Sequence, residues 1–160
     1  MTVSVWRIAT DAPDYAADDL TGAGAKLTGG RWNRKGVPMC YSSGSIALSC
    51  LETVVHLNAG GLPLNRYLVE VAIPDDIWQA AEAFASTDHV GWDAEPAGRV
   101  SLDFGSAWVA SGRSVLLHVP SVIVPEELNI LINPSHPDRH RLRVRKVRKW
   151  FYDGRIKSSR

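Results

Sequence analysis

The sequence predicts a single α+β domain, a small mixed β-sheet with short helices. Segments that alternate apolar and polar residues, typical of half-buried strands, recur along the chain, and two or three other stretches have helical spacing. The chain has 160 residues, of which 45% are hydrophobic. That suffices for one domain with its own core and excludes a chain that is disordered throughout. No apolar run approaches the length of a membrane-spanning helix.

Three strands are expected before residue 75. Residues 3–8 and 66–73 alternate apolar and polar side chains, and residues 37–41 form a short, mainly apolar run. Residues 9–30, which separate the first strand from the second, are rich in Asp, Gly and Thr and are expected to form a loop. A loop of this length inside a compact domain usually has a function or covers a site.

Residues 45–58 predict a helix, because apolar side chains recur there at helical spacing. Three serines are candidate N-caps of this helix: Ser42, Ser43 and Ser45. The Gly60-Gly61 pair is expected to end it. The apolar residues that share one broad face are Ile46, Ala47, Cys50, Leu51, Val54 and Leu57. Glu52 lies off that face, on a polar stripe with Ser45, Ser49 and His56.

The second half of the chain predicts a helix over residues 102–110, which ends near Gly112. Strands are expected at four further places, residues 114–119, 121–124, 128–132 and 141–151. The first two of these form either a strand pair or one strand that Pro120 interrupts.

The formal net charge of +1 conceals a strong asymmetry. Residues 139–160 contain ten Lys and Arg and one acid, whereas residues 1–138 contain 8 basic and 16 acidic residues. Such an end either binds nucleic acid or an acidic partner, or matches the acidic body of its own chain. Arginine alternates with other residues over 139–145, which predicts an edge strand protected from aggregation by its charges. That strand could also dock an acidic partner or a second subunit.

The densest functional signal is the segment Gly29-Gly30-Arg31-Trp32-Asn33-Arg34-Lys35-Gly36. Paired glycines let a backbone approach a ligand closely, and an arginine beside them can hold a phosphate or carboxylate with two hydrogen bonds. The spacing matches neither a P-loop nor a dinucleotide-binding GxGxxG motif. An ordinary turn is the alternative interpretation.

Tyr41, Glu52 and Ser121 are further candidates, and each also has an ordinary explanation. Tyr41 either offers a stacking platform for a flat ring or packs as a half-buried strand residue. Glu52 is either a carboxylate aimed into a cleft or part of a solvated helix face. Ser121 lacks a Gly-x-Ser-x-Gly elbow, which argues against a serine hydrolase, and a hydroxyl bonded to the backbone would explain it.

The cysteines and histidines predict neither a disulfide framework nor a metal site. Cys40 and Cys50 lack zinc spacing, and a chain with two cysteines and no visible secretory signal suits a reducing cytoplasm. His136 and His140 are four residues apart, but Pro137 lies between them and no HExxH motif is present.

A set of motifs in a fixed order resembles one known family. The motifs are Gly30-Arg31-Trp32-Asn33-x-x-Gly36-Val37-Pro38-x-x-Tyr41, Ala47-Leu48-x-x-Leu51-Glu52-x-x-Val55-His56-Leu57, Ile73-Pro74-Asp75, Pro120-Ser121-x-Ile123-Val124-Pro125 and Leu131-Ile132-Asn133-Pro134-x-His136-Pro137. From about residue 4 to residue 155 the chain resembles the RES-domain toxins of bacterial toxin–antitoxin systems. The Arg, Glu and Ser that name this family correspond to Arg31, Glu52 and Ser121, with Tyr41 as a fourth shared site residue.

The resemblance implies one RES domain over residues 1–160, with residues 139–160 as its basic C-terminal strand and tail. It implies a fold similar to that of ADP-ribosyltransferases and a site that binds NAD⁺ through Arg31, Tyr41 and Ser121. The leading hypothesis is a cytoplasmic toxin that depletes NAD⁺ by cleaving its nicotinamide–ribose bond, by hydrolysis or phosphorolysis. Neither a metal nor a cofactor beyond NAD⁺ as substrate is expected.

Three other functions remain open at this point. One is transfer of ADP-ribose from NAD⁺ to a cellular protein, and another is nucleic-acid binding through the basic tail. The third is a non-catalytic interaction module. The resemblance further implies a cognate antitoxin with a helix-turn-helix DNA-binding domain. DNA would be reached only through that antitoxin, no membrane would be involved, and a homodimer could form within the complex.

The residue types suit the chemistry that the resemblance implies. Nicotinamide carries a positive charge in NAD⁺ and leaves as a neutral molecule, so one carboxylate serves where an ordinary glycosidase uses two. Glu52 is expected to stabilise the ribose cation and to orient or deprotonate the acceptor. Arg31 is expected to hold the pyrophosphate or a ribose oxygen, and Tyr41 to stack on nicotinamide. Ser121 is expected to bond the ribose or the amide, or to position Glu52.

Overall fold

A seven-stranded β-sheet with four short α-helices forms the protein, as a computed structural model describes it for residues 1–57 and 61–156. The strand order is β4-β5-β6-β2-β1-β3-β7. The strands are β1 (Thr2–Thr10), β2 (Cys40–Ser43), β3 (Arg66–Pro74), β4 (Glu82–Ala83), β5 (Leu116–Pro120), β6 (Leu128–Ile132) and β7 (Arg143–Lys149). The helices are α1 (Ala23–Thr28), α2 (Ile46–Val54), α3 (Asp75–Gln79) and α4 (Arg99–Ser111). The predicted α+β class is confirmed.

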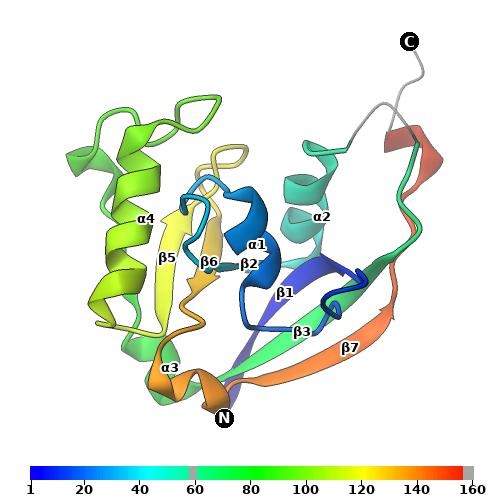
Figure 1. The fold of residues 1–160 in the computed structure, drawn as a ribbon, viewed down its shortest axis with the longest axis horizontal. Helices are drawn as coiled ribbons and strands as arrows, with labels where there is room; N and C mark the ends of the chain where they lie inside the picture. Colours follow the sequence, from blue (N-terminus) through cyan, green and yellow to red (C-terminus); the bar gives the residue numbers. More distant parts are fainter. Residues whose placement is uncertain (58–60, 157–160) are drawn as a thin grey trace.

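The sheet consists of two halves that meet at one point. All neighbouring strands are antiparallel except β4 and β5, which run parallel. β1 and β3 pair along their whole length, from Thr2 opposite Pro74 to Thr10 opposite Arg66. β1 and β2, in contrast, share only the pair Trp6 and Ser43. Figure 1 shows the consequence: β5 and β6 stand on one side, β1, β3 and β7 on the other, and α1 and α2 lie between the halves.

Apolar side chains of both halves form the core. Val5, Val71 and Ile73 on the β1–β3 side are fully buried and belong to one cluster with Leu116 and Ile132 of the other half. A second cluster joins α4 to β5 and β6. Its buried members are Trp32, Met39, Phe84, Trp108, Val109, Leu117, Val119 and Leu131. The alternation that predicted the strands therefore correctly marks buried positions. No helix within the two described segments is long and apolar enough to span a membrane.

The prediction of a loop over residues 9–30 is wrong in part. β1 continues to Thr10, and residues 23–28 form α1 between two left-handed glycines, Gly22 with φ 74° and Gly29 with φ 71°. The helix has only six residues and no buried one, so it leaves no apolar periodicity in the sequence. The strand expected at 37–41 instead begins at Cys40, after Pro38.

The helix expected at 45–58 is α2, and Ser45 is its N-cap. The Ser45 hydroxyl accepts a hydrogen bond from the Leu48 amide at 3.1 Å, as the sequence predicts. The helix ends at Val54, four residues early; Asn58 and Gly60 lie outside the described residues. The predicted face packs in part on the core, through Ile46, Cys50, Val54 and Leu57. Leu51 and Ala47 are exposed, and Leu48 is buried instead.

In the second half, β6 spans the predicted residues, and α4 ends at Gly112, whose φ is 63°. Residues 121–124 form no strand, which corrects that prediction: β5 stops at Pro120, and the chain turns. The Ser121 amide bonds the Glu127 carbonyl at 2.9 Å across this turn. α3, β4 and a 3-10 helix at Pro137–Arg141 were not predicted, because each has five residues or fewer.

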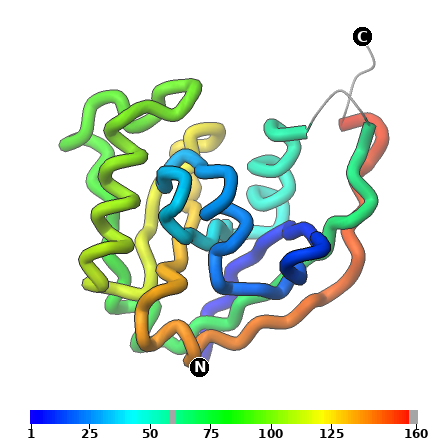
Figure 2. The backbone as a smooth tube through the Cα atoms, in the orientation of Figure 1, coloured from blue at the N-terminus to red at the C-terminus, as the bar shows by residue number. Residues whose placement is uncertain are grey.

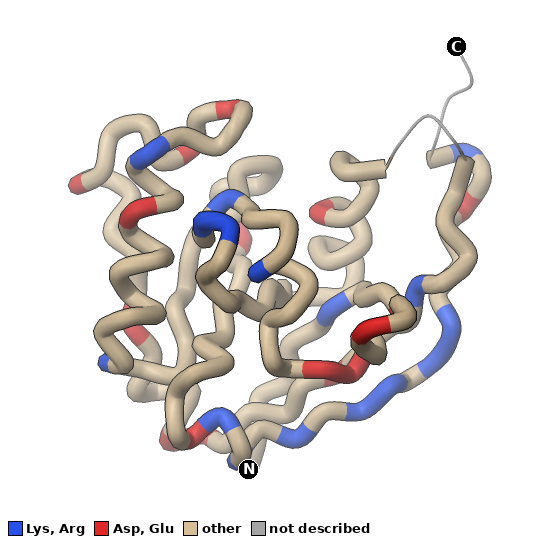
Figure 3. The backbone as a smooth tube through the Cα atoms, viewed as in Figure 1, with Lys and Arg blue, Asp and Glu red and all other residues tan. Residues whose placement is uncertain are grey.

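The basic C-terminal strand is β7, at the edge of the sheet, as predicted. Figure 3 shows its row of Lys and Arg, and Figure 2 shows β7 beside the segment that follows β1. Three ion pairs join the 139–146 region to the acidic body: Arg141–Asp76, Arg145–Glu70 and Lys146–Asp11. The match between end and body, one of the two alternatives, is thus part of the fold. Residues 157–160 of the tail lie outside the described residues.

We expect Gly105→Ala to destabilise the protein although alanine favours helices. Gly105 lies inside α4, and a Cβ there would overlap the Trp32 backbone carbonyl. Helix propensity alone favours alanine by about 1 kcal/mol, whereas overpacking against backbone costs about 3 kcal/mol or more. Urea denaturation measures the balance. Gly98→Ala is the control, since a Cβ at that N-cap would meet its nearest neighbour at an ordinary 3.6 Å. If the Gly105→Ala protein is as stable as the parent, α4 does not pack as closely on the Trp32 backbone as in this structure.

Candidate active site

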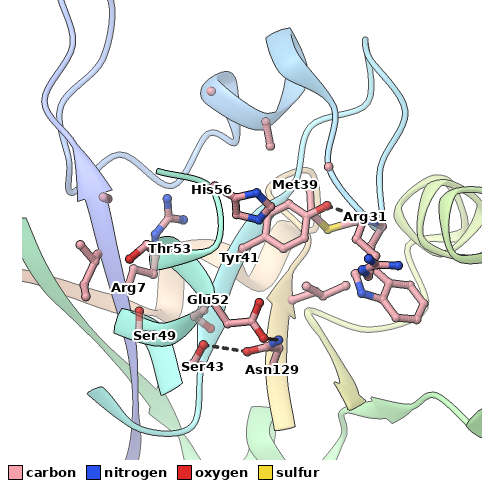
Figure 4. A pocket seen from close by; sticks show the side chains of 18 of the residues that line it. Arg7, Arg31, Met39, Tyr41, Ser43, Ser49, Glu52, Thr53, His56 and Asn129 are labelled. Atoms are coloured by element: carbon pink, nitrogen blue, oxygen red, sulfur yellow. Dashed lines mark hydrogen bonds between the residues drawn. The ribbon is translucent and has the colours of Figure 1, made fainter. Parts of the chain in front are cut away.

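A cavity of about 1040 Å³ opens where the two halves of the sheet diverge. Its walls come from β1, β2, β6, α1, α2 and the segment that follows α1. Three of the four predicted site residues line it, Arg31, Tyr41 and Glu52. Ser121 is fully buried and contacts Glu52 instead of lining the cavity. Figure 4 shows the labelled side chains of this cavity.

The glycine-arginine segment is a tight turn that Tyr41 holds in place. The Gly30 amide bonds the Asn33 carbonyl at 3.0 Å, and a Cβ on Gly30 would lie only 2.6 Å from the Tyr41 hydroxyl. That hydroxyl accepts the Trp32 amide at 3.0 Å and donates to Oδ1 of Asn33. Burial raises the pKa of Tyr41, so the phenol remains a donor. Position 30 therefore requires glycine, because any side chain there would collide with the Tyr41 hydroxyl.

Arg31 points along the cavity wall and is already paired. Its guanidinium donates to the Ala94 carbonyl at 2.7 Å and to the Trp92 carbonyl at 3.4 Å, and it forms an ion pair with Glu95 at 2.6 Å. The Arg31 side chain is only 18% exposed, whereas that of Glu95 is 78% exposed. An anionic ligand would reach this arginine only in competition with the Glu95 carboxylate.

Glu52 projects from α2, and hydrogen bonds from the other half of the sheet fix its carboxylate. Oε1 accepts the Ser121 hydroxyl at 2.6 Å and the Asn129 side-chain amide at 2.8 Å. The Ser43 hydroxyl in turn donates to Oδ1 of Asn129 at 2.7 Å. Oε2 has no hydrogen-bond partner within residues 1–57 and 61–156. The carboxylate thus has a fixed orientation and one oxygen free for a ligand.

The Ser121 hydroxyl takes part in two hydrogen bonds besides the one to Glu52. Its Oγ accepts the amides of Ile123 and Val124, each at 3.1 Å. The hydroxyl proton is thereby left for Glu52, because both amides approach the oxygen as donors. Ser121 is a residue that positions the carboxylate, one of the two roles predicted from the sequence.

Arg7 is a cation of the cavity wall that sequence reasoning missed. It lies on β1 two residues after the fully buried Val5, and Nε and Nη1 are buried without a hydrogen-bond partner among the described residues. The signal was present, since alternation over residues 3–8 puts Arg7 on the face of Val5. Asn129 and Ser43 were also missed. Asn129 donates to Glu52 and Ser43 donates to Asn129, contacts between residues 77 and 86 positions apart that one sequence does not encode.

The groups of the cavity that concern the chemistry are the fixed Glu52 carboxylate, the guanidinium groups of Arg7 and Arg31, the Tyr41 ring and the His56 imidazole. Burial raises the pKa of both free thiols, Cys40 and Cys50, which makes them weak nucleophiles. Within the part of the chain that the structure describes, no cluster of three or more His, Cys, Asp or Glu could hold a metal ion. Such a set suits an anionic ligand in which positive charge develops near the carboxylate.

Tyr41→Phe should lower the free energy of unfolding by about 1–3 kcal/mol, because buried Asn33 and the Trp32 amide lose their partner. Urea denaturation at pH 7 measures the loss. Because burial raises the pKa of Tyr41 in the folded state, its contribution is full below the ordinary tyrosine pKa of about 10 and declines above it. The difference between parent and variant should therefore narrow above about pH 10. A constant difference up to pH 11 would contradict a buried phenol.

The chain is similar to known toxins over nearly its whole length. Residues 4–153 match the RES domain family. A Sphingobium protein named "Prs ADP-ribosylating toxin" is 66% identical over 157 residues, 98% of each chain. Two proteins named "Toxin Res" are more distant: one from Yersinia enterocolitica, 36% identical over 76% of this chain and 79% of its own, and one from Photorhabdus laumondii, 35% identical over 79% and 80%. The predicted resemblance is thereby confirmed, and the chain belongs to the RES domain family.

Proposed function

We propose that this protein is a toxin that transfers ADP-ribose from NAD⁺ to a protein acceptor. The observation that carries the proposal is the Glu52 carboxylate inside a cavity with two arginines. Two hydrogen bonds fix it through Oε1, and Oε2 has no partner within the described part of the chain. The fold supports it, because RES domains resemble ADP-ribosyltransferases. The name of the Sphingobium relative favours transfer over the NAD⁺ depletion that was our leading hypothesis. We further propose that the acceptor is the protein called Prs in that name.

The bond that breaks joins C1′ of the ribose to the nicotinamide nitrogen. Its electron pair moves onto nicotinamide, which leaves neutral, so no residue needs to protonate it. Positive charge then develops on the ribose, and Oε2 of Glu52 stabilises it. The hydrogen bonds from Ser121 and Asn129 hold the carboxylate in place before the charge appears, so little reorganisation is needed.

Arg7 is the better anchor for the two phosphates of NAD⁺. Its guanidinium lies beside the Cys40 thiol, but its Nε and Nη1 are buried without a hydrogen-bond partner among the described residues. A buried cationic donor without a partner is costly unless a ligand satisfies it. Arg31 is paired with Glu95 and two carbonyls, so it shapes the wall and binds a ribose oxygen or a phosphate only as a second contact. The Tyr41 ring lines the cavity, where it can stack on nicotinamide.

Water in place of the protein acceptor would give hydrolysis, so slow NAD⁺ breakdown accompanies transfer in this scheme. A cognate antitoxin belongs to the proposal, because the relatives from Yersinia and Photorhabdus carry the name "Toxin Res". Its test is toxicity of the protein expressed alone, relieved by co-expression of a neighbouring helix-turn-helix protein that co-purifies with it.

Glu52→Gln should lower the rate of ADP-ribose transfer to purified Prs by about 100-fold or more, because the amide keeps the shape and loses the charge. Mass spectrometry of Prs after incubation with NAD⁺ measures the transfer. Glu126→Gln is the matched control, an exposed glutamate outside the cavity. Full transfer by Glu52→Gln would remove Glu52 from the chemistry.

Arg7→Gln should weaken NAD⁺ binding by about 10- to 100-fold, the effect of losing a hydrogen bond to a charged group. Titration calorimetry measures it, with Glu52→Gln as the background so that NAD⁺ is not consumed. Arg31→Ala should weaken binding less, and Arg99→Gln, on an exposed residue at the start of α4, should not change it. If the Arg7→Gln protein binds NAD⁺ as tightly as the protein with Arg7, the phosphates bind to other residues.

A further inference from the structure

His56 is the one imidazole among the described residues that line the cavity. Its backbone amide bonds the Thr53 carbonyl at 3.1 Å, a bond over three residues that tightens the turn after α2. Side chains three residues apart in such a turn lie on one side, and Thr53 lines the cavity as well. Figure 4 shows the His56 ring and the Glu52 carboxylate projecting into the same space.

The ring of His56 is available to a ligand. The residue is exposed, and its ring nitrogens form no hydrogen bond or ion pair within residues 1–57 and 61–156. Thr53, in contrast, has its hydroxyl engaged, since it donates to the Cys50 carbonyl and accepts the Tyr152 hydroxyl. On this side of the cavity the His56 imidazole is therefore the side chain free to take a proton from a ligand.

Exposed apolar side chains lie close to the same place. Val55 is 55% exposed and Ile123 is 38% exposed, and both line the cavity. Val55 follows Glu52 by three residues, and Ile123 follows Ser121, the donor to Glu52, by two. Two exposed apolar side chains therefore line the cavity that holds the Glu52 carboxylate, a surface suited to a protein partner.

We propose that His56, Val55 and Ile123 form the subsite for the protein acceptor, and that His56 takes the proton from the acceptor's nucleophile. The inference rests on the proposed transferase function. The occupant is a neutral proton-bearing side chain, a hydroxyl or an amine, because a carboxylate nucleophile has no proton to lose. Apolar residues around that side chain pack on Val55 and Ile123.

In this proposal Glu52 stabilises the cation and His56 takes the acceptor's proton, so two roles that the sequence suggested for Glu52 alone are divided between two residues. Oε1 is occupied by Ser121 and Asn129, and Oε2 faces the cation that forms at C1′. In the step itself, the C1′–nicotinamide bond breaks and its electrons leave with nicotinamide. A lone pair of the acceptor forms the new bond to C1′, and its proton moves to an imidazole nitrogen of His56 and then to water.

The test compares His56→Ala with the parent and with His140→Ala, a histidine outside the cavity. Transfer of ADP-ribose to Prs should fall by about 100-fold or more, the lower end of the range for losing a general base. NAD⁺ affinity, measured by calorimetry in the Glu52→Gln background, should stay within about twofold, because His56 contacts the acceptor and not the dinucleotide. Added imidazole should restore transfer by His56→Ala, which a merely structural defect would not allow.

The Ile123→Ser variant provides a second, independent test of the acceptor subsite. Its KM for Prs should rise by about fivefold or more with the KM for NAD⁺ unchanged, since only apolar contact with the acceptor is lost. If the parent labels Prs and His56→Ala labels it equally fast, the subsite is wrong and the transferase function stands. Loss of NAD⁺ binding with transfer would also overturn the subsite and place His56 in the NAD⁺ site. If the parent leaves Prs unlabelled, the transferase function fails, and the subsite fails with it.

Discussion

The two hydrogen bonds that Ser121 and Asn129 donate to Glu52 are the interaction on which the site depends. Glu52 comes from α2, while Ser121 follows β5 and Asn129 lies on β6, so the bonds join the helix to the far half of the sheet. β1 and β2 meet at only one residue pair, and the halves diverge around a cavity beyond it. The carboxylate is held at the seam by donors from one side and by its helix on the other. A charge fixed in this way stabilises a developing cation without first having to reorient.

The same constraint explains which site residues a single sequence reveals. Arg31, Tyr41 and Glu52 lie in short motifs. Their chemical types alone suggested an anion-binding arginine, a ring that stacks on the ligand and a carboxylate in the cleft. Asn129 and Ser43 carry no local signal, because their roles exist only once β6 and β2 are paired beneath α2. Arg7 was predictable, because it is a charged residue on the buried face of a strand. The alternation of that strand was used only to predict which residues pack in the core. Arg31 proved to be paired within the protein, which no local pattern indicates.

The fold shows a similar division. β1 and β3 were predictable because apolar and polar residues alternate along them, β6 because it is a short apolar run, and α4 because Gly112 ends it in a left-handed conformation. α1, α3 and β4 were not, since each is too short to show a period, and residues 121–124 looked like a strand although Ser121 caps a turn there. The charge asymmetry first suggested nucleic acid. In the structure, part of the basic charge of the C-terminal end is paired with Asp11, Glu70 and Asp76 of the same chain.

The proposed toxin transfers ADP-ribose from NAD⁺ to a protein and not chiefly to water. The most direct measurement counts two products of one reaction of the purified protein with NAD⁺ and Prs: nicotinamide released, by chromatography, and ADP-ribose bound to Prs, by mass spectrometry. The account predicts that the two appear in nearly equal amounts and that free ADP-ribose stays a minor product. Release of nicotinamide with all of the ADP-ribose free in solution, or as its phosphate, would contradict it.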